Sequence, residues 1–128
     1  MNQEDKKLLL KDLCARLPYG VKGIITYDES NTTFTVEGID NIVLHLSDAE
    51  ECYVEDFKPY LRPMSSMTEE EYKEYSKLWN LQDEFPTDAD IRFKTDVFDW
   101  LNAHHFDYRG LIEKGLVLQA PEGMYNIK

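Results

Sequence analysis

The sequence has few cysteines, and no two of them lie close together. Cys14 and Cys52 are the only cysteines, and no C-x-x-C motif is present. A zinc ribbon or a redox dithiol needs such paired cysteines, so the sequence excludes both. Apolar residues surround each cysteine, which predicts two small buried hydrophobic side chains in a reducing compartment, the cytoplasm.

Motifs that mark common enzymes and nucleotide sites are also missing. The six glycines form neither G-x-G-x-x-G nor a P-loop, and G-x-S-x-G is absent. The stretch "TDADIRFKTD" holds Asp88 and Asp90 but lacks the glycine and the distal glutamate of a calcium loop. No apolar run is long enough for a signal peptide or a transmembrane helix. We therefore expect no cofactor and no membrane segment, and we treat catalysis as an alternative hypothesis.

Basic residues are scarce in the middle of the chain. The 128 residues carry a net charge of -11, and residues 47–90 hold thirteen acidic side chains against four basic ones. Such a field repels phosphate backbones and anionic membranes, so direct binding to nucleic acid or to a membrane is not expected. The negative charge favours binding to a partner protein with a basic surface, or it only keeps the protein soluble. The composition does not define an oligomeric state.

Length and patterning predict one α+β domain over residues 1–128. With 42% hydrophobic residues the chain can bury a real core. Helical spacing of leucines predicts a helix over 3–17. Alternating apolar residues in "VKGIITY", "TTFTVEG", "IVLHLSD" and "ECYVE" predict three or four antiparallel strands, in a curled sheet or a small SH3-like barrel. Residues 1–62 thus contain the helix and the strands, and residues 63–128 are mainly helical.

Prolines interrupt the second half of the chain. In "VEDFKPYLRPMSSM" they predict a turn of helix and then an extended connector. "MTEEEYKEYSKLW" predicts a helix in which Thr68 is the cap and Glu71 reaches back to it. Residues 80–93 are interpreted as a loop, and a last helix is predicted from near Thr95 to about His104. "LVLQA" predicts a terminal strand that joins the edge of this sheet or of a neighbour's.

Three long strings carry a family resemblance. "KDLCARLPYGVK", "KPYLRPMSSMTEEE" and "HFDYRGLIEKGLVLQAPEGMYN" resemble segments of an uncharacterised family of small acidic proteins from gut Bacteroidales and their prophages and mobile elements. The strings lie at both ends and in the middle, so the resemblance spans most of the chain. It implies a bacterial or phage protein in the cytoplasm of the host, and it transfers no catalytic residue.

Two adjacent histidines near the last helix end are candidates for metal binding. His104 and His105 point to different sides of a helix, so a metal site would have to recruit His45, Asp107 or a cysteine from elsewhere. The structural interpretation is favoured. It places His104 in packing contacts and His105 at the helix C-terminus, where a partial positive charge is favourable.

The residues that follow the histidines can also be interpreted as a catalytic group or as structural residues. Asp107, Tyr108 and Arg109 offer an acid, a phenol and a cation, but a sequential triplet has no catalytic spacing of its own. We expect Asp107 to cap the following turn and Arg109 to pair with a carboxylate from the acidic middle of the chain. The alternative is a small metal-dependent enzyme centred on His104, His105 and Asp107.

The acidic stretch has two interpretations, a solvated surface or a recognition face. Tyr72, Tyr75 and Trp79 would be interface anchors if exposed and core residues if buried. The residues predicted to contact a partner are Glu55, Asp56, Glu69, Glu70, Glu74, Asp83 and Glu84.

The first functional hypothesis is a non-catalytic acidic protein-interaction module of a bacterial mobile element or phage. Its partner would be another protein with a basic surface. The alternatives are an inhibitor that mimics nucleic acid and blocks a host nucleic-acid enzyme, and the small metal-dependent enzyme described above.

Overall fold

A computed structural model describes the backbone of residues 2–80 and 88–125, and the side chains of 2–78 and 96–125. The elements are α1 (Gln3–Arg16), β1 (Lys22–Ile25), β2 (Phe34–Asp40), β3 (Val43–Leu46), β4 (Glu51–Tyr53), β5 (Phe57–Pro63), α2 (Glu69–Asn80), α3 (Asp88–Ala103), β6 (Phe106–Asp107) and β7 (Leu118–Gln119). The sheet order is β4-β3-β2-β1-β5-β6, with β7 also paired with β5. The sheet is open, so within the described residues the barrel alternative is not realised, and the α+β prediction is confirmed.

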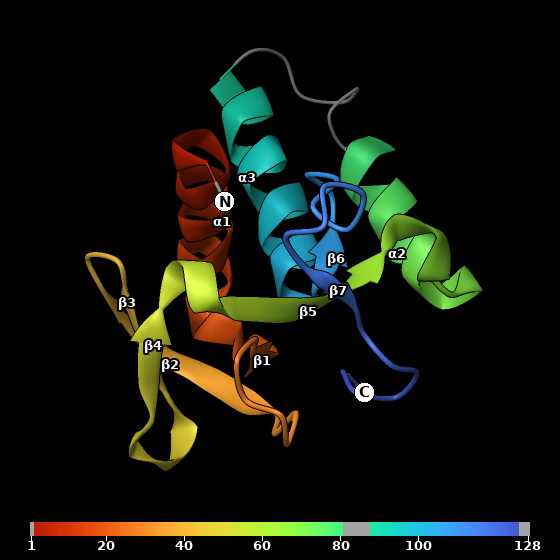
Figure 1. Cartoon of the computed structure of the whole chain (residues 1–128). Helices are drawn as coiled ribbons and strands as arrows, with labels where there is room; N and C mark the ends of the chain where they lie inside the picture. Colours follow the sequence, from red (N-terminus) through yellow and green to blue (C-terminus); the bar gives the residue numbers. More distant parts are fainter. Residues whose placement is uncertain (1, 81–87, 126–128) are drawn as a thin grey trace.

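The helices lie together on one side of β5. In Figure 1, α1 and α3 stand side by side above β5, with β1 to β4 below them on the left and α2 on the right. Leu9 and Leu13 of α1 are fully buried in a cluster with residues from the sheet and from the segment 111–117. A second cluster, around Leu101 and Phe106, lies between α2 and α3. The first helix therefore covers the sheet, as its apolar stripe predicts.

The segment predicted as an extended connector is a strand of the sheet. β5 pairs antiparallel with β1 and parallel with β6 and β7. Phe57, Pro59 and Leu61 are buried, and the residues between them are only partly buried. This two-residue alternation is the signal for a strand. The prediction of an extended connector was wrong because it relied on the prolines, which bar a long helix, and did not use the alternation.

The last helix begins earlier than predicted. α3 starts at Asp88, so residues 88–93 are helical and not part of a loop. Acidic side chains in the first turn favour a helix start, and Asp88 and Asp90 supply this signal. Asn80, the first residue of the predicted loop, is the last residue of α2, and residues 81–87 lie outside the described residues. The predicted terminal strand is confirmed, and β7 pairs with β5 of its own chain.

Of the two cysteines, one is buried and one is exposed. Cys52 on β4 is buried as predicted, and burial together with the charge of Asp56 raises the pKa of its thiol to about 11. Cys14 is exposed, so that prediction was wrong. The buried face of α1 consists of Leu9, Asp12, Leu13 and Arg16, and Cys14 does not lie on it.

Gly23 allows β1 to lie close against β5. A Cβ at this position would lie 2.5 Å from the carbonyl oxygen of Lys58 and 2.5 Å from the ring of Phe57. We expect Gly23→Ala to lower the free energy of unfolding by about 1–3 kcal/mol, because the backbone or a fully buried ring must move. Gly38→Ala in β2 is the matched control, since its Cβ would meet nothing closer than 3.7 Å. Chemical denaturation measures both variants, and equal losses would contradict the close-packing argument.

Candidate functional site

The two histidines face different surroundings. Nδ1 of His104 lies 2.9 Å from the carbonyl oxygen of Trp100, and the two rings stack with centroids 4.1 Å apart. His105 is only 3% exposed and stacks on Tyr125 with centroids 3.7 Å apart. The prediction of a packed His104 is confirmed. The side chains of His104 and His105 do not converge on one site.

His105 is uncharged in the folded protein. Its backbone is left-handed, with φ of 62°, directly after the end of α3, and its side chain is buried. Burial, and then the positive charge of Arg16, lower the pKa of His105 to about 3. The prediction of a partly charged histidine at the helix end was wrong. The helix has already ended at Ala103, and the turn buries the ring instead of leaving it beside the last carbonyls.

Asp107 is a capping residue, as predicted. Its two carboxylate oxygens accept hydrogen bonds from the backbone N–H groups of Leu111 and Ile112, both at 2.9 Å. The side chain is 8% exposed, and both oxygens are occupied by the turn. A carboxylate that accepts two backbone hydrogen bonds in this way stabilises the turn.

Arg109 has a different partner from the one predicted. Its Nε donates to Oδ1 of Asp12 on α1 at 3.1 Å, and not to a carboxylate of the acidic middle. Asp12 also accepts from Nε of Arg16 at 2.8 Å, and both of these side chains are fully buried. The prediction was wrong because ninety-seven positions separate Arg109 from Asp12, and no local pattern reports such a contact.

The structure therefore does not assemble the predicted metal or catalytic centre. His104, His105 and Asp107 are each engaged by a different neighbour. Among the side chains described, no group of three or more histidines, cysteines, aspartates or glutamates is placed to hold a metal ion. His45 lies elsewhere, at the other end of the sheet, where its Nδ1 is 3.5 Å from Glu51.

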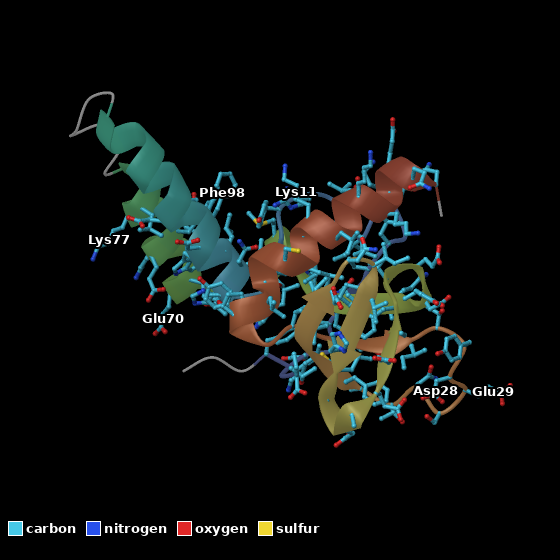
Figure 2. The ribbon with its side chains drawn as sticks, turned by 90° about the vertical axis from the view of Figure 1, so that its left-hand side faces the viewer. Lys11, Asp28, Glu29, Glu70, Lys77 and Phe98 are labelled. Carbon is cyan, nitrogen blue, oxygen red and sulfur yellow. The ribbon has the colours of Figure 1, made fainter. Side chains whose placement is uncertain are left out.

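The acidic residues predicted as a recognition face fall into separate groups. Glu70 and Glu74 line one cleft, whereas Glu69 lines a neighbouring groove. Glu55 lies 3.6 Å from Lys6 of α1, and Asp56 lines a hollow at the opposite side of the molecule. Asp83 and Glu84 lie outside the described residues. Figure 2 shows Glu70 far from the acidic loop that carries Asp28 and Glu29.

The cleft that holds Glu70 and Glu74 is here called the α2 cleft. It has a volume of about 730 Å³ and lies between the first turns of α2, the end of β5 and the segment 119–125. Its carboxylates are Glu70, Glu71, Glu74 and Glu122. Of the described side chains that line it, only Arg62 is a permanent cation. The α2 cleft therefore has an excess of negative charge.

The single arginine of the α2 cleft is already neutralised. Its Nη1 and Nη2 donate to the two carboxylate oxygens of Glu71 at 2.8 and 2.7 Å. This pairing with Arg62 lowers the pKa of Glu71 to about 2, against the opposing effect of burial. The predicted capping box is confirmed, because Glu71 accepts from the N–H of Thr68 and the Thr68 hydroxyl accepts from the N–H of Glu71. Glu70, Glu74 and Glu122 supply the remaining negative charge.

A second, more apolar depression lies on the other side of α2 and is here called the α2 groove. Its volume is about 560 Å³, and Met64, Met67, Tyr72 and Tyr75 are among the residues that line it. Tyr72 is 62% exposed, whereas Tyr75 is partly buried with its ring 5.8 Å from that of Trp100. Tyr72 thus meets the condition for an interface anchor, and Tyr75 packs in the second cluster. The side chain of Trp79 lies outside the described residues.

Comparison with known proteins gives no relative. No family model, no curated protein and no solved structure matches the chain. Within the described part of the chain, none of the helices is both long enough and apolar enough to cross a membrane.

Sequence reasoning missed the part of the α2 cleft that comes from distant segments. Arg62, His104 and Glu122 all line it, yet none of them was predicted to contact a partner. The "KPYLRP" stretch was predicted to be a connector, so no partner was predicted for Arg62. The only local signal was the capping glutamate at 71, whose charge must be balanced by some cation when it is partly buried.

Proposed function

We propose that this chain is a non-catalytic acidic interaction module of a bacterial mobile element or phage. It binds a basic segment of another protein at the α2 cleft. The observation that carries this proposal is the charge balance of the cleft, where the sole arginine is paired with Glu71 and three further carboxylates remain. A concave surface with convergent carboxylates suits lysine and arginine side chains.

The geometry of α2 also supports a protein partner. Glu70 and Glu74 lie one helical turn apart and both line the α2 cleft, so one extended basic segment can meet both. Across the helix, Tyr72 stands exposed in the α2 groove. Exposed tyrosines beside charged residues are typical anchors of protein interfaces. The basic segment of the partner would contact the cleft, and its apolar side chains would contact Tyr72.

Charge reversal in the cleft tests the proposal. We expect Glu70→Lys with Glu74→Lys to weaken binding of the partner about thirtyfold or more, which corresponds to roughly 2 kcal/mol for two lost charge contacts. The partner is obtained by capturing the tagged protein from the bacterium that carries the sequence. Mass spectrometry identifies it, and calorimetry with the purified proteins gives the affinities.

The matched control reverses two other exposed carboxylates. Glu37→Lys with Glu113→Lys makes the same change in net charge outside both depressions of α2. This variant should retain the partner, and the melting temperatures of both variants should stay within a few degrees of the parent. Equal affinity for the two variants, or no specific partner for the parent, would contradict the proposal. Competition by duplex DNA would identify the partner's surface as a nucleic-acid site, in line with the mimicry alternative.

A further inference from the structure

A third hollow lies at the other end of the molecule from α2. It has a volume of about 280 Å³ and is lined by Tyr27, Val43, Glu51, Cys52, Tyr53 and Asp56. We call it the tyrosine hollow. Figure 2 places Asp28 and Glu29, which directly follow Tyr27, on the opposite side of the molecule from Glu70. The hollow is therefore separate from the α2 cleft and cannot be part of the same contact with one short segment.

The tyrosine hollow has two aromatic rings on its rim that the core does not use. Tyr27 is 67% exposed and Tyr53 is 52% exposed, and both are among the five large hydrophobic side chains that are exposed within residues 2–78 and 96–125. On β4 the burial alternates, so Glu51 and Tyr53 face outward while Cys52 faces the core. Exposing large aromatic rings to water is unfavourable, and two rings at one hollow suggest a contact surface.

The charge of the hollow is negative and unbalanced. Glu51 and Asp56 are its two carboxylates, and none of the described side chains that line it is a lysine or an arginine. Glu51 has a basic neighbour in His45, whose Nδ1 is 3.5 Å away at the surface. Cys52 stays a neutral thiol at neutral pH, because burial and Asp56 hold the pKa of its thiol near 11. The hollow therefore combines aromatic faces with carboxylates, and the Cys52 thiol adds no charge to it at neutral pH.

We propose that the tyrosine hollow binds an arginine side chain of another protein. Aromatic faces attract a flat cation through their quadrupole, and a guanidinium can stack on a ring while its N–H groups donate to a carboxylate. Tyr27 and Tyr53 supply the faces, and Glu51 and Asp56 supply the acceptors. This inference does not rest on the proposed function of the α2 cleft, since the two sites share no residue.

An arginine peptide and its uncharged isostere test this inference. The probe is the peptide Gly-Gly-Arg-Gly-Gly with blocked ends, and the control probe has citrulline in place of arginine. Each is titrated into the ¹⁵N-labelled full chain. We expect the arginine peptide to shift the amide signals of Tyr27, Tyr53 and Glu51 at millimolar concentration, and the citrulline peptide to shift them little. Replacing the exposed rings in Tyr27→Ser with Tyr53→Ser should weaken this binding at least about fivefold.

Three results would overturn the inference. They are no shift at these residues with the arginine peptide, equal shifts with the citrulline peptide, and undiminished binding to the Tyr27→Ser, Tyr53→Ser variant. The Glu70→Lys, Glu74→Lys variant separates the two sites, because it should bind the arginine peptide at the tyrosine hollow as the parent does. Shifts confined to the α2 cleft would overturn this inference and leave the proposed function standing.

Discussion

Asp12→Ala is expected to lower the free energy of unfolding by about 3–5 kcal/mol, because it leaves a buried cation without its counter-ion. Asp12 and Arg16 are both 0% exposed. The carboxylate accepts from Nε and Nη2 of Arg16 at 2.8 and 3.2 Å and from Arg109 at 3.1 Å. After the substitution, Arg16 retains the hydrogen bond from Nη2 to the carbonyl oxygen of Phe106, at 2.6 Å, and the contact with the ring of Tyr108, but no anionic partner among the described residues. Its Nη1 has no hydrogen-bond partner among the described residues even in the parent protein.

Asp5→Ala on the same helix is the matched control. Asp5 lies in the first turn of α1, where a carboxylate interacts favourably with the helix dipole. Its loss should cost less than about 1 kcal/mol. Urea denaturation followed by circular dichroism measures both variants. If Asp12→Ala lost no more stability than Asp5→Ala, the buried ion pair would not be a main support of the fold. Asp12→Asn should lose stability like Asp12→Ala, because it also removes the charge.

Acidification is expected to destabilise the protein through His105. In the unfolded chain a histidine has its ordinary pKa near 6.5, whereas burial and Arg16 lower the pKa of His105 in the folded protein to about 3. The unfolded chain therefore takes up a proton that the folded protein does not. The stability is fully present above pH 6.5 and is lost as the pH falls from 6.5 towards 3. At about 1.4 kcal/mol per pKa unit, the loss from this residue is on the order of 5 kcal/mol.

His105→Asn isolates this contribution. Asparagine does not titrate in this range and tolerates the left-handed backbone at position 105. The variant should be less stable at neutral pH, because it loses the stack on Tyr125, and its stability should fall less steeply between pH 6.5 and 4. Denaturation curves at several pH values give the pH dependence of the free energy of unfolding for the parent and for the variant, and the carboxylates contribute to it in both proteins. An equal pH dependence in the two proteins would mean that protonation of His105 does not destabilise the folded protein.

Local signals predicted much of the fold. Helix α1 follows from its leucine spacing, and β1 to β4 follow from alternation between turns, since both patterns report which residues face the core. The capping pair of Thr68 and Glu71 and the cap at Asp107 were also predictable, because each involves residues only a few positions apart. Such short-range hydrogen bonds depend on spacing alone.

Contacts between distant segments could not be predicted in this way. Arg109 meets Asp12, and Tyr125 donates to the carbonyl oxygen of Tyr60 at 2.8 Å. The local sequence around Arg109 or Tyr125 does not predict which distant residue it contacts. The α2 cleft depends on the same kind of contact, because the segment 119–125 forms one of its walls. The acidic residues on α2 were identified from the sequence, but their division between a cleft and a groove required the fold.

The pairing of β5 also determines the order in which the chain can assemble during synthesis. Its antiparallel neighbour β1 precedes it, so that ladder can close as soon as residue 63 has left the ribosome. Its parallel neighbours β6 and β7 are made later, because they begin at Phe106 and Leu118. Until they emerge, one edge of β5 exposes unpaired backbone groups, which is the kind of edge that recruits other strands. A nascent chain stalled before residue 106 is therefore expected to need a chaperone, and a chain that includes β6 and β7 is not.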